Sequence, residues 1–513
     1  MTEDAGPLPP AFPFMRLPLE LREQVYSHYF HPGDHLVRNP VLEAKGFYGG
    51  VYQWDLDVFY VNKQIYRESK RVWDRENIFV KIATPWPTAG MYQVYLMATD
   101  GVSEQGSMSM SESSSGHREL PLLLQAKSEN KINHISSEGL VPIVCADSKA
   151  AACKAHHAVV QIDSPLQGVE PEHMVIMLMD DLPLFAKTWY YSALSYPMLN
   201  ERLHATFTLR NPLKEEGHGD DGAENREEEG LGVPISLQKK LLLPFEHVKG
   251  LAGVFIHGFS RSVRSELARL QAIPIPTLQQ SLESATDLML AGDTALSNPD
   301  SARDAAALEA LDLYKKAFHA IHILIYNRTR RVMADVFFHD AVAHGRYAGQ
   351  TGMTIRVLLR LQLVARTVAA YNQLRQWDDS AFWGMRSINI LTESFSPSFE
   401  AFLTHLHNGA DVGFIYVRTG IAFWHMEQNR EDWMGELISY ADDPMARSER
   451  LWEVAGRFVK PAVREKARGE LLAYGVPKEK VAELFMSGQA TTRETESVEV
   501  QDGSGSSDED VWI

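Results

Sequence analysis

The stretch LPLELREQVYSHYF at residues 17–30 has the apolar spacing of an amphipathic helix. Pro18 suits the first helical turn, where its missing N–H group costs nothing. Leu21, Val25 and Tyr29 follow one another at every fourth position and form one apolar stripe. Because burial of such a stripe is favourable, it needs a partner surface, either elsewhere in this chain or on another protein.

A second amphipathic helix is predicted in the stretch FYVNKQIYRESKRVWDRENIF at residues 59–79. Its apolar face consists of Val61, Ile65, Ser69, Val72 and Trp73. Its opposite face is basic and consists of Lys63, Arg67, Lys70 and Arg71. Asn77 is expected to end the helix, and a strand is expected to begin at Ile78.

The two segments together resemble the F-box, and more closely the F-box-like heads common among fungal proteins. The matching residues are Leu17-Pro18-x-Glu20-Leu21-x-x-x-Val25 and Val61-x-x-Gln64-Ile65-Tyr66-x-Glu68. In that family these helices dock onto the Skp adaptor of cullin–RING ubiquitin ligases, and the rest of the chain recruits a substrate. The resemblance implies that the partner-docking residues are Leu17, Pro18, Leu21, Val25 and Ile65.

The chain departs from a standard F-box in its long linker at residues 30–57 and in the basic charge of its second helix. A structural interpretation therefore stands beside the docking interpretation. In it, the two helices only cover the region that follows them, with Tyr26 and Trp73 buried inside. Both interpretations predict a small helical head over residues 1–82.

Residues 83–258 are predicted to form an α+β middle domain. Short β-branched segments predict strands at 77–82, 92–98, 141–146, 157–163, 174–179, 205–210 and 254–257. The segment 182–199 is more typical of a helix. A serine-rich stretch near 101–118 and an acidic, glycine-rich stretch near 214–230 predict disordered loops.

Residues 259–488 are predicted to be all-α, with helical apolar spacing at 265–273, 278–296, 302–345 and 353–374. Ala310, Tyr314 and Ala317 have the spacing A-x3-[FY]-x2-A. This spacing resembles the second helix of a tetratricopeptide repeat, where small residues let helices approach and the aromatic ring fills the space between them. A degenerate second match contains Tyr371 and Trp377.

The repeat resemblance implies a helical groove suited to binding protein, with Tyr314, Tyr371 and Trp377 as its residues. A helical bundle without repeat symmetry is the alternative. The fold class expected for the whole chain is therefore multidomain α+β, with a helical C-terminal half.

Bulk composition narrows the function classes. The chain has 513 residues, a formal net charge of -17 and two cysteines. So large an acidic excess disfavours attraction to nucleic acid or to anionic membranes. Two cysteines make neither a disulfide framework nor a zinc signature, and no apolar run approaches the roughly 18 residues of a membrane span. Since the N-terminus is also unlike a secretory signal, the protein is expected in the cytoplasm or nucleus.

No nucleophile elbow, P-loop, dinucleotide-binding or catalytic-cysteine motif occurs in the sequence. His319 and His322 lie one helical turn apart without a carboxylate nearby in the sequence, so they are interpreted as structural, and neither a metal nor a cofactor is expected. The predicted disordered acidic tail, 489–513, places Ser506 and Ser507 before three acidic residues. Acidophilic kinases favour that context, so both serines are predicted phosphorylation sites.

These observations predict a protein–protein interaction adaptor that recruits a substrate as an F-box-type subunit of a cullin–RING ubiquitin ligase. Its expected partners are the Skp adaptor and the recruited substrate. The alternative is a non-catalytic helical-repeat scaffold whose head is only structural. A third class is an enzyme with a dispersed active site, which a pocket of converging His and Asp side chains would favour.

Overall fold

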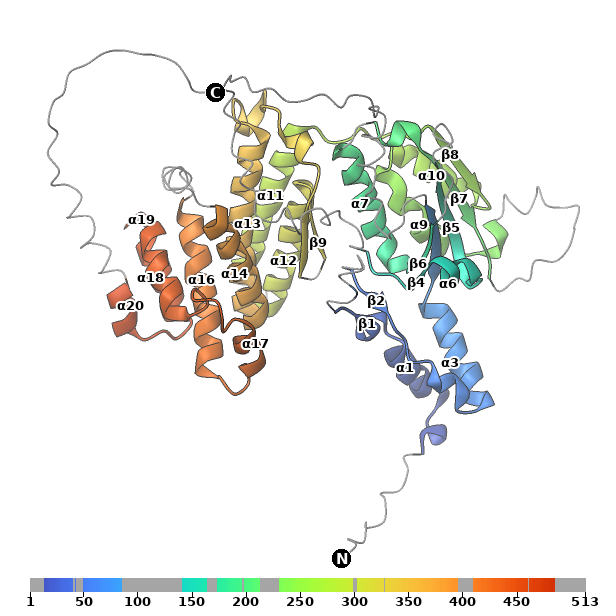
Figure 1. Ribbon diagram of the computed structural model, residues 1–513, viewed down its shortest axis with the longest axis horizontal. Coiled ribbons are helices and arrows are strands. Elements are labelled where there is room, and N and C mark those ends of the chain that lie inside the picture. Colours follow the sequence, from blue (N-terminus) through green and yellow to red (C-terminus); the bar gives the residue numbers. More distant parts are fainter. Residues whose placement is uncertain are drawn as a thin grey trace, which may run out of the picture. The chain divides into compact units, whose positions relative to one another are not determined.

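The structure is a computed structural model that describes residues 13–39, 42, 49–84, 141–163, 173–195, 198–212, 230–298, 302–326, 328–394, 409–459 and 461–484. The chain divides into two compact units (Figure 1). The sheet unit consists of residues 1–277 and 329–337, and the helical unit consists of residues 278–328 and 338–513. The fold is therefore mixed α+β with a helical C-terminal half, as the sequence predicts.

The sheet unit contains a six-stranded mixed sheet with the strand order β4-β6-β3-β5-β7-β8. The strands are β3 (Phe79–Thr84), β4 (Cys145–Ala146), β5 (His156–Asp163), β6 (His173–Leu178), β7 (His204–Leu209) and β8 (Gly253–His257). The pairs β3/β5 and β7/β8 are parallel, and the other neighbours are antiparallel. Two further short strands, β1 (Leu36–Val37) and β2 (Val51–Tyr52), pair with each other.

Alternating side chains of the central strands are buried, as expected for strands whose two faces differ in cover. Val160 and Ile162 of β5 lie opposite Phe207 and Ala205 of β7. They share the main core with three helices, α7 (Leu182–Ser195), α9 (Ile235–Leu242) and α10 (Arg261–Gln271). A smaller cluster on the other face includes Ala150 of α6 (Asp147–Ala152).

The head, residues 13–76, packs two helices, α1 (Leu19–Tyr29) and α3 (Lys63–Glu76), against each other. The side chain of Asn62 caps α3 by accepting hydrogen bonds from the backbone N–H groups of Gln64 and Ile65, both 2.9 Å long. Aromatic rings fill the space behind the helices. The ring of Trp73 lies 5.1 Å from that of Phe30 and 5.8 Å from that of Phe79 in β3, so the head packs directly onto the sheet.

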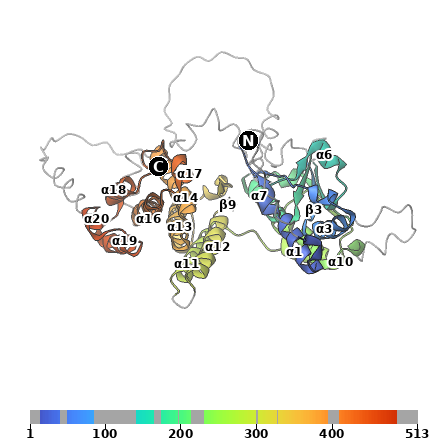
Figure 2. The same cartoon turned by 90° about the horizontal axis from the view of Figure 1, so that it is seen from below.

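The helical unit is a succession of antiparallel neighbours. Its helices are α11 (Leu278–Leu296), α12 (Arg303–Ala320), α13 (Gly352–Leu374), α14 (Trp377–Ser394), α16 (Gly409–Gln428), α17 (Met434–Ser439), α18 (Ser448–Phe458), α19 (Pro461–Ala473) and α20 (Lys478–Leu484). The most extensive contacts join α11 with α12 and α16 with α18, and the contacts of α14 with α16, of α12 with α13 and of α13 with α14 are smaller and similar to one another. Alternate helices also meet, since α13 contacts both α11 and α16. Figures 1 and 2 show α13, α14, α16 and α18 following one another across the unit, with α17 beside α14.

Glycine residues mark the closest approaches between these helices. A Cβ atom at Gly292 of α11 would lie 2.4 Å from the ring of Tyr314 in α12. At Gly384 of α14 it would lie 1.9 Å from the hydroxyl of Thr419 in α16, and at Gly420 of α16 it would lie 2.3 Å from the indole of Trp452 in α18. Since no side chain fits at these points, glycine sets the spacing of each pair.

The structure differs from two sequence predictions. The helix predicted over 302–345 ends at Ala320, because His322 has a left-handed backbone (φ 55°) and β9 (Ile323–Tyr326) and β10 (Thr329–Val332) follow. The boundaries at 82 and 258 do not coincide with the division into units, since the head and α10 both belong to the sheet unit. The strand predicted at 92–98, the loop near 101–118, nearly all of the loop near 214–230 and the tail lie outside the described residues.

Candidate docking surface and charged row

The buried face of α1 is polar at its centre. The guanidinium of Arg22 donates two hydrogen bonds to the carboxylate of Glu68 on α3, Nε to Oε2 at 2.8 Å and Nη2 to Oε1 at 2.7 Å. The hydroxyl of Tyr26 and the amide of Gln64 donate to the same carboxylate, at 3.2 Å and 2.9 Å. A third nitrogen of Arg22 donates to the carbonyl oxygen of Leu17. The pair thus fixes both the crossing of the two helices and the start of α1.

This arrangement shifts two pKa values in opposite directions. The hydrogen bonds from Arg22 lower the pKa of Glu68 from 4.5 to about 2, against the effect of burial. Burial, with Glu68 nearby, raises the pKa of Tyr26 to about 12. Near neutral pH, Glu68 is therefore charged and Tyr26 is a neutral hydrogen-bond donor.

The outer face of α1 is apolar instead. Leu21 and Val25 are 44% and 46% exposed, while Arg22 and Tyr26, one position further along, are 8% and 2% exposed. The chain therefore leaves Leu21 and Val25 of the predicted stripe to solvent, whereas Tyr29, its third member, is half-buried and packs against the core of the head. Other large apolar side chains of the head are exposed as well: Met15, Leu19, Leu56, Tyr60, Val61 and Tyr66. Exposed apolar side chains gathered on one small element are typical of a binding surface.

The other predicted docking residues are placed as follows. Pro18 is exposed immediately before α1, and Leu17 is half-buried. Ile65 requires a correction, because it is 7% exposed and packs in the core of the head with Phe30 and Val72. Its apolar contacts are satisfied inside the chain, so it supports the docking helix from behind rather than contacting a partner.

Two of the three groove residues of the helical unit also require correction. Tyr314 is 1% exposed and lies against Gly292, and Trp377 is 8% exposed and stacks on the imidazole of His425 at 4.0 Å between ring centroids. These two rings fill space between helices. Tyr371 is half-buried, and burial raises its pKa, so its place in a groove stays a prediction. Ala310 and Ala317, on the same helix as Tyr314, are fully buried.

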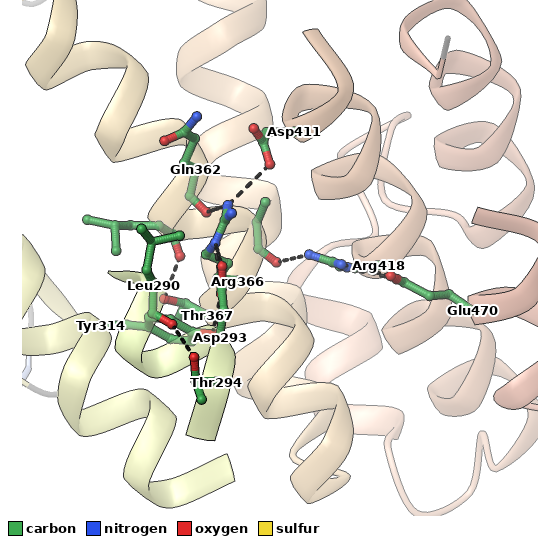
Figure 3. Close-up of polar contacts among 12 residues, drawn as sticks. Leu290, Asp293, Thr294, Tyr314, Gln362, Arg366, Thr367, Asp411, Arg418 and Glu470 are labelled. Carbon is green, nitrogen blue, oxygen red and sulfur yellow. Dashed lines mark hydrogen bonds and ion pairs between the residues drawn. The ribbon is translucent and has the colours of Figure 1, made fainter. Parts of the chain in front are cut away.

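A row of charged side chains links helices of the helical unit (Figure 3). Arg366 of α13 donates from Nε to both carboxylate oxygens of Asp293 on α11, each at 2.9 Å, and from Nη1 to Asp411 of α16 at 3.2 Å. The hydroxyl of Tyr314 donates to Asp293 at 2.9 Å. The side chain of Arg366 is 21% exposed, so the row reaches the surface of the unit.

The row continues from α16 to α19. Arg418 binds both carboxylate oxygens of Glu470 at 2.8 Å and donates to the carbonyl oxygen of Ala365 at 2.7 Å. Burial alone would lower the pKa of Arg418, but the carboxylate of Glu470 reverses this effect and the pKa is raised. Each arginine therefore ties three elements of the stack together, and their pairing is internal to the chain.

Sequence reasoning missed Arg22, Arg366 and Arg418. Glu68 stands in the quoted motif, but its partner Arg22 lies 46 residues away. The pairs of Arg366 and Arg418 span 73, 45 and 52 residues, so no local spacing signals them. Arg22 lies between Leu21 and Val25 of the stripe, but this position does not show whether an arginine is exposed or buried.

The described residues contain neither a metal-binding cluster nor a membrane-spanning helix. No group of three or more His, Cys, Asp or Glu side chains within the described residues is arranged to hold a metal ion. His322 is buried, which lowers its pKa to about 3, and its backbone carbonyl accepts a hydrogen bond from Arg356 at 3.2 Å. None of the helices in the described part of the chain has the length and apolar character of a membrane span.

Comparison with known proteins yields no relative. No protein-family model matches the chain, and neither the curated proteins nor the solved structures contain a match.

Proposed function

We propose that this chain is a protein–protein interaction adaptor whose head docks onto another protein through the outer face of α1. The partner that the resemblance to the F-box suggests is the Skp adaptor, which would make the chain a substrate-recruiting subunit of a cullin–RING ubiquitin ligase. Cytoplasm and nucleus are the compartments in which such a subunit would work.

The exposure of Leu21 and Val25 is the observation that carries this proposal. On one helix the chain buries an arginine and exposes a leucine and a valine. The pair with Glu68 offsets the cost of burying Arg22, but the exposure of Leu21 and Val25 forgoes a favourable burial of apolar side chains. An external partner that covers the outer face supplies the missing reason.

The helical unit supports a recruiting role. Consecutive helices that also contact alternate helices form the kind of stack that presents an extended surface to a peptide or protein. The charged row of Asp293, Arg366, Asp411, Arg418 and Glu470 joins the alternate helices of this stack. We propose that the substrate binds to the surface of these helices.

The test is co-purification of the full chain with the Skp adaptor, for the wild type and for a Leu21→Asp, Val25→Asp variant. Both side chains are exposed, so we expect the variant to keep its circular dichroism and to melt within a few degrees of the wild type. We expect adaptor capture to fall at least tenfold. The matched control is Leu290→Asp, Leu308→Asp, which changes two leucines that are 48% and 58% exposed in the helical unit and should not alter capture.

Failure of the wild type to capture the adaptor would contradict ligase docking and favour the scaffold alternative, in which the head is only structural. Equal loss in both double variants would mean that added negative charge, rather than the face of α1, weakens capture.

A further inference from the structure

Helix α3 carries a basic stripe that the proposed docking of α1 does not use. Lys63, Arg67 and Arg71 follow one another at every fourth position, and all three are exposed. The next residue of the stripe, Arg75, pairs with Glu23 and Glu76, and Lys70 on the adjacent face pairs with Asp74. For Lys63, Arg67 and Arg71, by contrast, no carboxylate of the described residues lies within ion-pair distance.

This arrangement opposes the stability of the helix. Like charges four residues apart repel each other on a helix surface. Lys63 is also the first residue of α3, where the helix dipole disfavours a cation, and the first turn contains no acidic residue. A chain with a formal net charge of -17 nevertheless concentrates positive charge here. Such local conflict is typical of a surface that binds something else.

Exposed apolar groups lie next to the stripe. Tyr60 and Val61 precede α3 and are 85% and 63% exposed, and Tyr66, between Lys63 and Arg67 in the sequence, is 45% exposed. The complementary ligand is therefore a short segment that combines acidic residues with a large apolar or aromatic side chain.

The chain itself contains such a segment. Residues 506–513 read SSDEDVWI, three consecutive acids followed directly by valine, tryptophan and isoleucine. The other acidic segment, residues 215–229, has no large apolar residue. We propose that residues 506–513 of this chain bind the stripe of Lys63, Arg67 and Arg71 and the adjoining rings of Tyr60 and Tyr66. Phosphorylation of Ser506 and Ser507 adds negative charge and strengthens this contact. The inference concerns α3 and stands independently of the Skp adaptor.

The experiment measures binding of a fluorescently labelled peptide of residues 504–513 to the full chain by anisotropy. The receiving chain carries Asp508→Asn, Glu509→Gln, Asp510→Asn and Trp512→Ala, so that its own tail does not compete. We expect saturable binding that weakens with added salt, since exposed charges are screened. A further variant of this chain carries Lys63→Gln, Arg67→Gln and Arg71→Gln. It should bind the peptide at least tenfold more weakly. Its melting temperature should not fall, because the substitutions also remove the repulsion between the three positive charges.

Three controls sharpen the result. Arg261→Gln with Arg269→Gln, two exposed arginines of α10, should leave binding unchanged. The chain with its natural tail should bind the labelled peptide several-fold more weakly, because its own tail occupies the site. A peptide phosphorylated on Ser506 and Ser507 should bind more tightly.

Four results would each overturn the proposal. If the glutamine triple variant bound the peptide as tightly as its parent chain, the stripe would not be part of the binding site. Equal binding by a 215–229 peptide would reduce the contact to unspecific charge. Absence of competition from the natural tail would mean that a different chain is the occupant. Binding of phosphatidylserine vesicles that depends on the stripe, without binding of the peptide, would assign the stripe to a lipid surface.

Discussion

The head and the helical unit treat apolar side chains in opposite ways. Among the described residues, eight large apolar side chains of the head are exposed, all between residues 15 and 66. The helical unit, although much longer, exposes five: Leu290, Leu308, Met434, Ile438 and Leu472. Exposed apolar side chains in this number are typical of an interaction surface, and the helical unit exposes fewer of them over a longer stretch of chain.

The two regions also differ in what holds them together. In the head, aromatic rings pack around the buried pair of Arg22 and Glu68, whose side chains are 9% and 12% exposed. In the helical unit, glycines bring helices into close contact, and the side chains of the Arg418–Glu470 pair are 11% and 23% exposed. The two regions therefore differ in the spacing of their helices rather than in the burial of their ion pairs. Substitutions that add volume should harm the helical unit most, and the three predictions below begin there.

The largest effect is expected at Gly420. In Gly420→Ala the new Cβ atom would lie 2.3 Å from the indole nitrogen of Trp452, which is 1% exposed and cannot move aside. Overpacking of this kind should destabilise the helical unit by about 1–3 kcal/mol, measured as a lower urea midpoint. The matched control is Gly469→Ala in α19, where a Cβ atom meets nothing within 4 Å. This substitution should raise the free energy of unfolding by about 0.5–1 kcal/mol, and with it the urea midpoint, because alanine is the better helix former. If both variants shifted the urea midpoint in the same direction, close helix packing at Gly420 would not be what distinguishes the two positions.

An intermediate effect is expected at Glu470. Glu470→Ala leaves the mostly buried guanidinium of Arg418 without its carboxylate partner, so we expect a loss of about 2 kcal/mol in unfolding experiments. Glu465→Ala on the same helix removes the partner of Arg468 in an exposed pair, since the side chain of Glu465 is 82% exposed. That loss should stay below about 0.5 kcal/mol. Two equal losses would mean that the charged row contributes no more than a surface pair.

The smallest effect, and one that depends on pH, is expected at Glu68. Its pKa is about 2 in the folded chain and 4.5 in the absence of structure, so the folded state holds its proton less tightly. The stabilisation is therefore complete above about pH 4.5 and disappears as the pH falls towards 2. Melting temperatures of wild type and Glu68→Gln should differ by a constant amount between pH 5 and pH 7 and converge below. A difference that grows on acidification would contradict the assigned ion pair.

The sequence predicts elements well where burial is one-sided. The strands at β5 and β7 follow from short β-branched segments, and α3 follows from its apolar face. The structure adds the alternating burial of both strands and the Asn62 cap of α3. The helix continued past Ala320 fails, because the apolar run IHILIY fits a buried strand as well as a buried helix and only the left-handed backbone of His322 separates the two.

The candidate site is predictable only in part. The stripe of Leu21 and Val25 is visible in the sequence, but its exposure is not, because periodicity shows that a face is apolar and not which partner covers it. Tyr314 and Trp377 illustrate the opposite case, since an aromatic residue at a repeat position is as suited to the space between helices as to a groove. The charged row joins residues 45 to 73 positions apart and becomes apparent only in the folded unit.

The passage from α3 to β3 is very short. Only Asn77 and Ile78 separate the two elements, and both are buried. This connection, together with the contact between the rings of Trp73 and Phe79, allows little room for the head to turn against the sheet. The sheet in turn ends at the edge strand β8, whose Val254 and Phe255 are exposed. A short, buried connection of this kind couples the orientation of α1 to that of the sheet more closely than a flexible linker would.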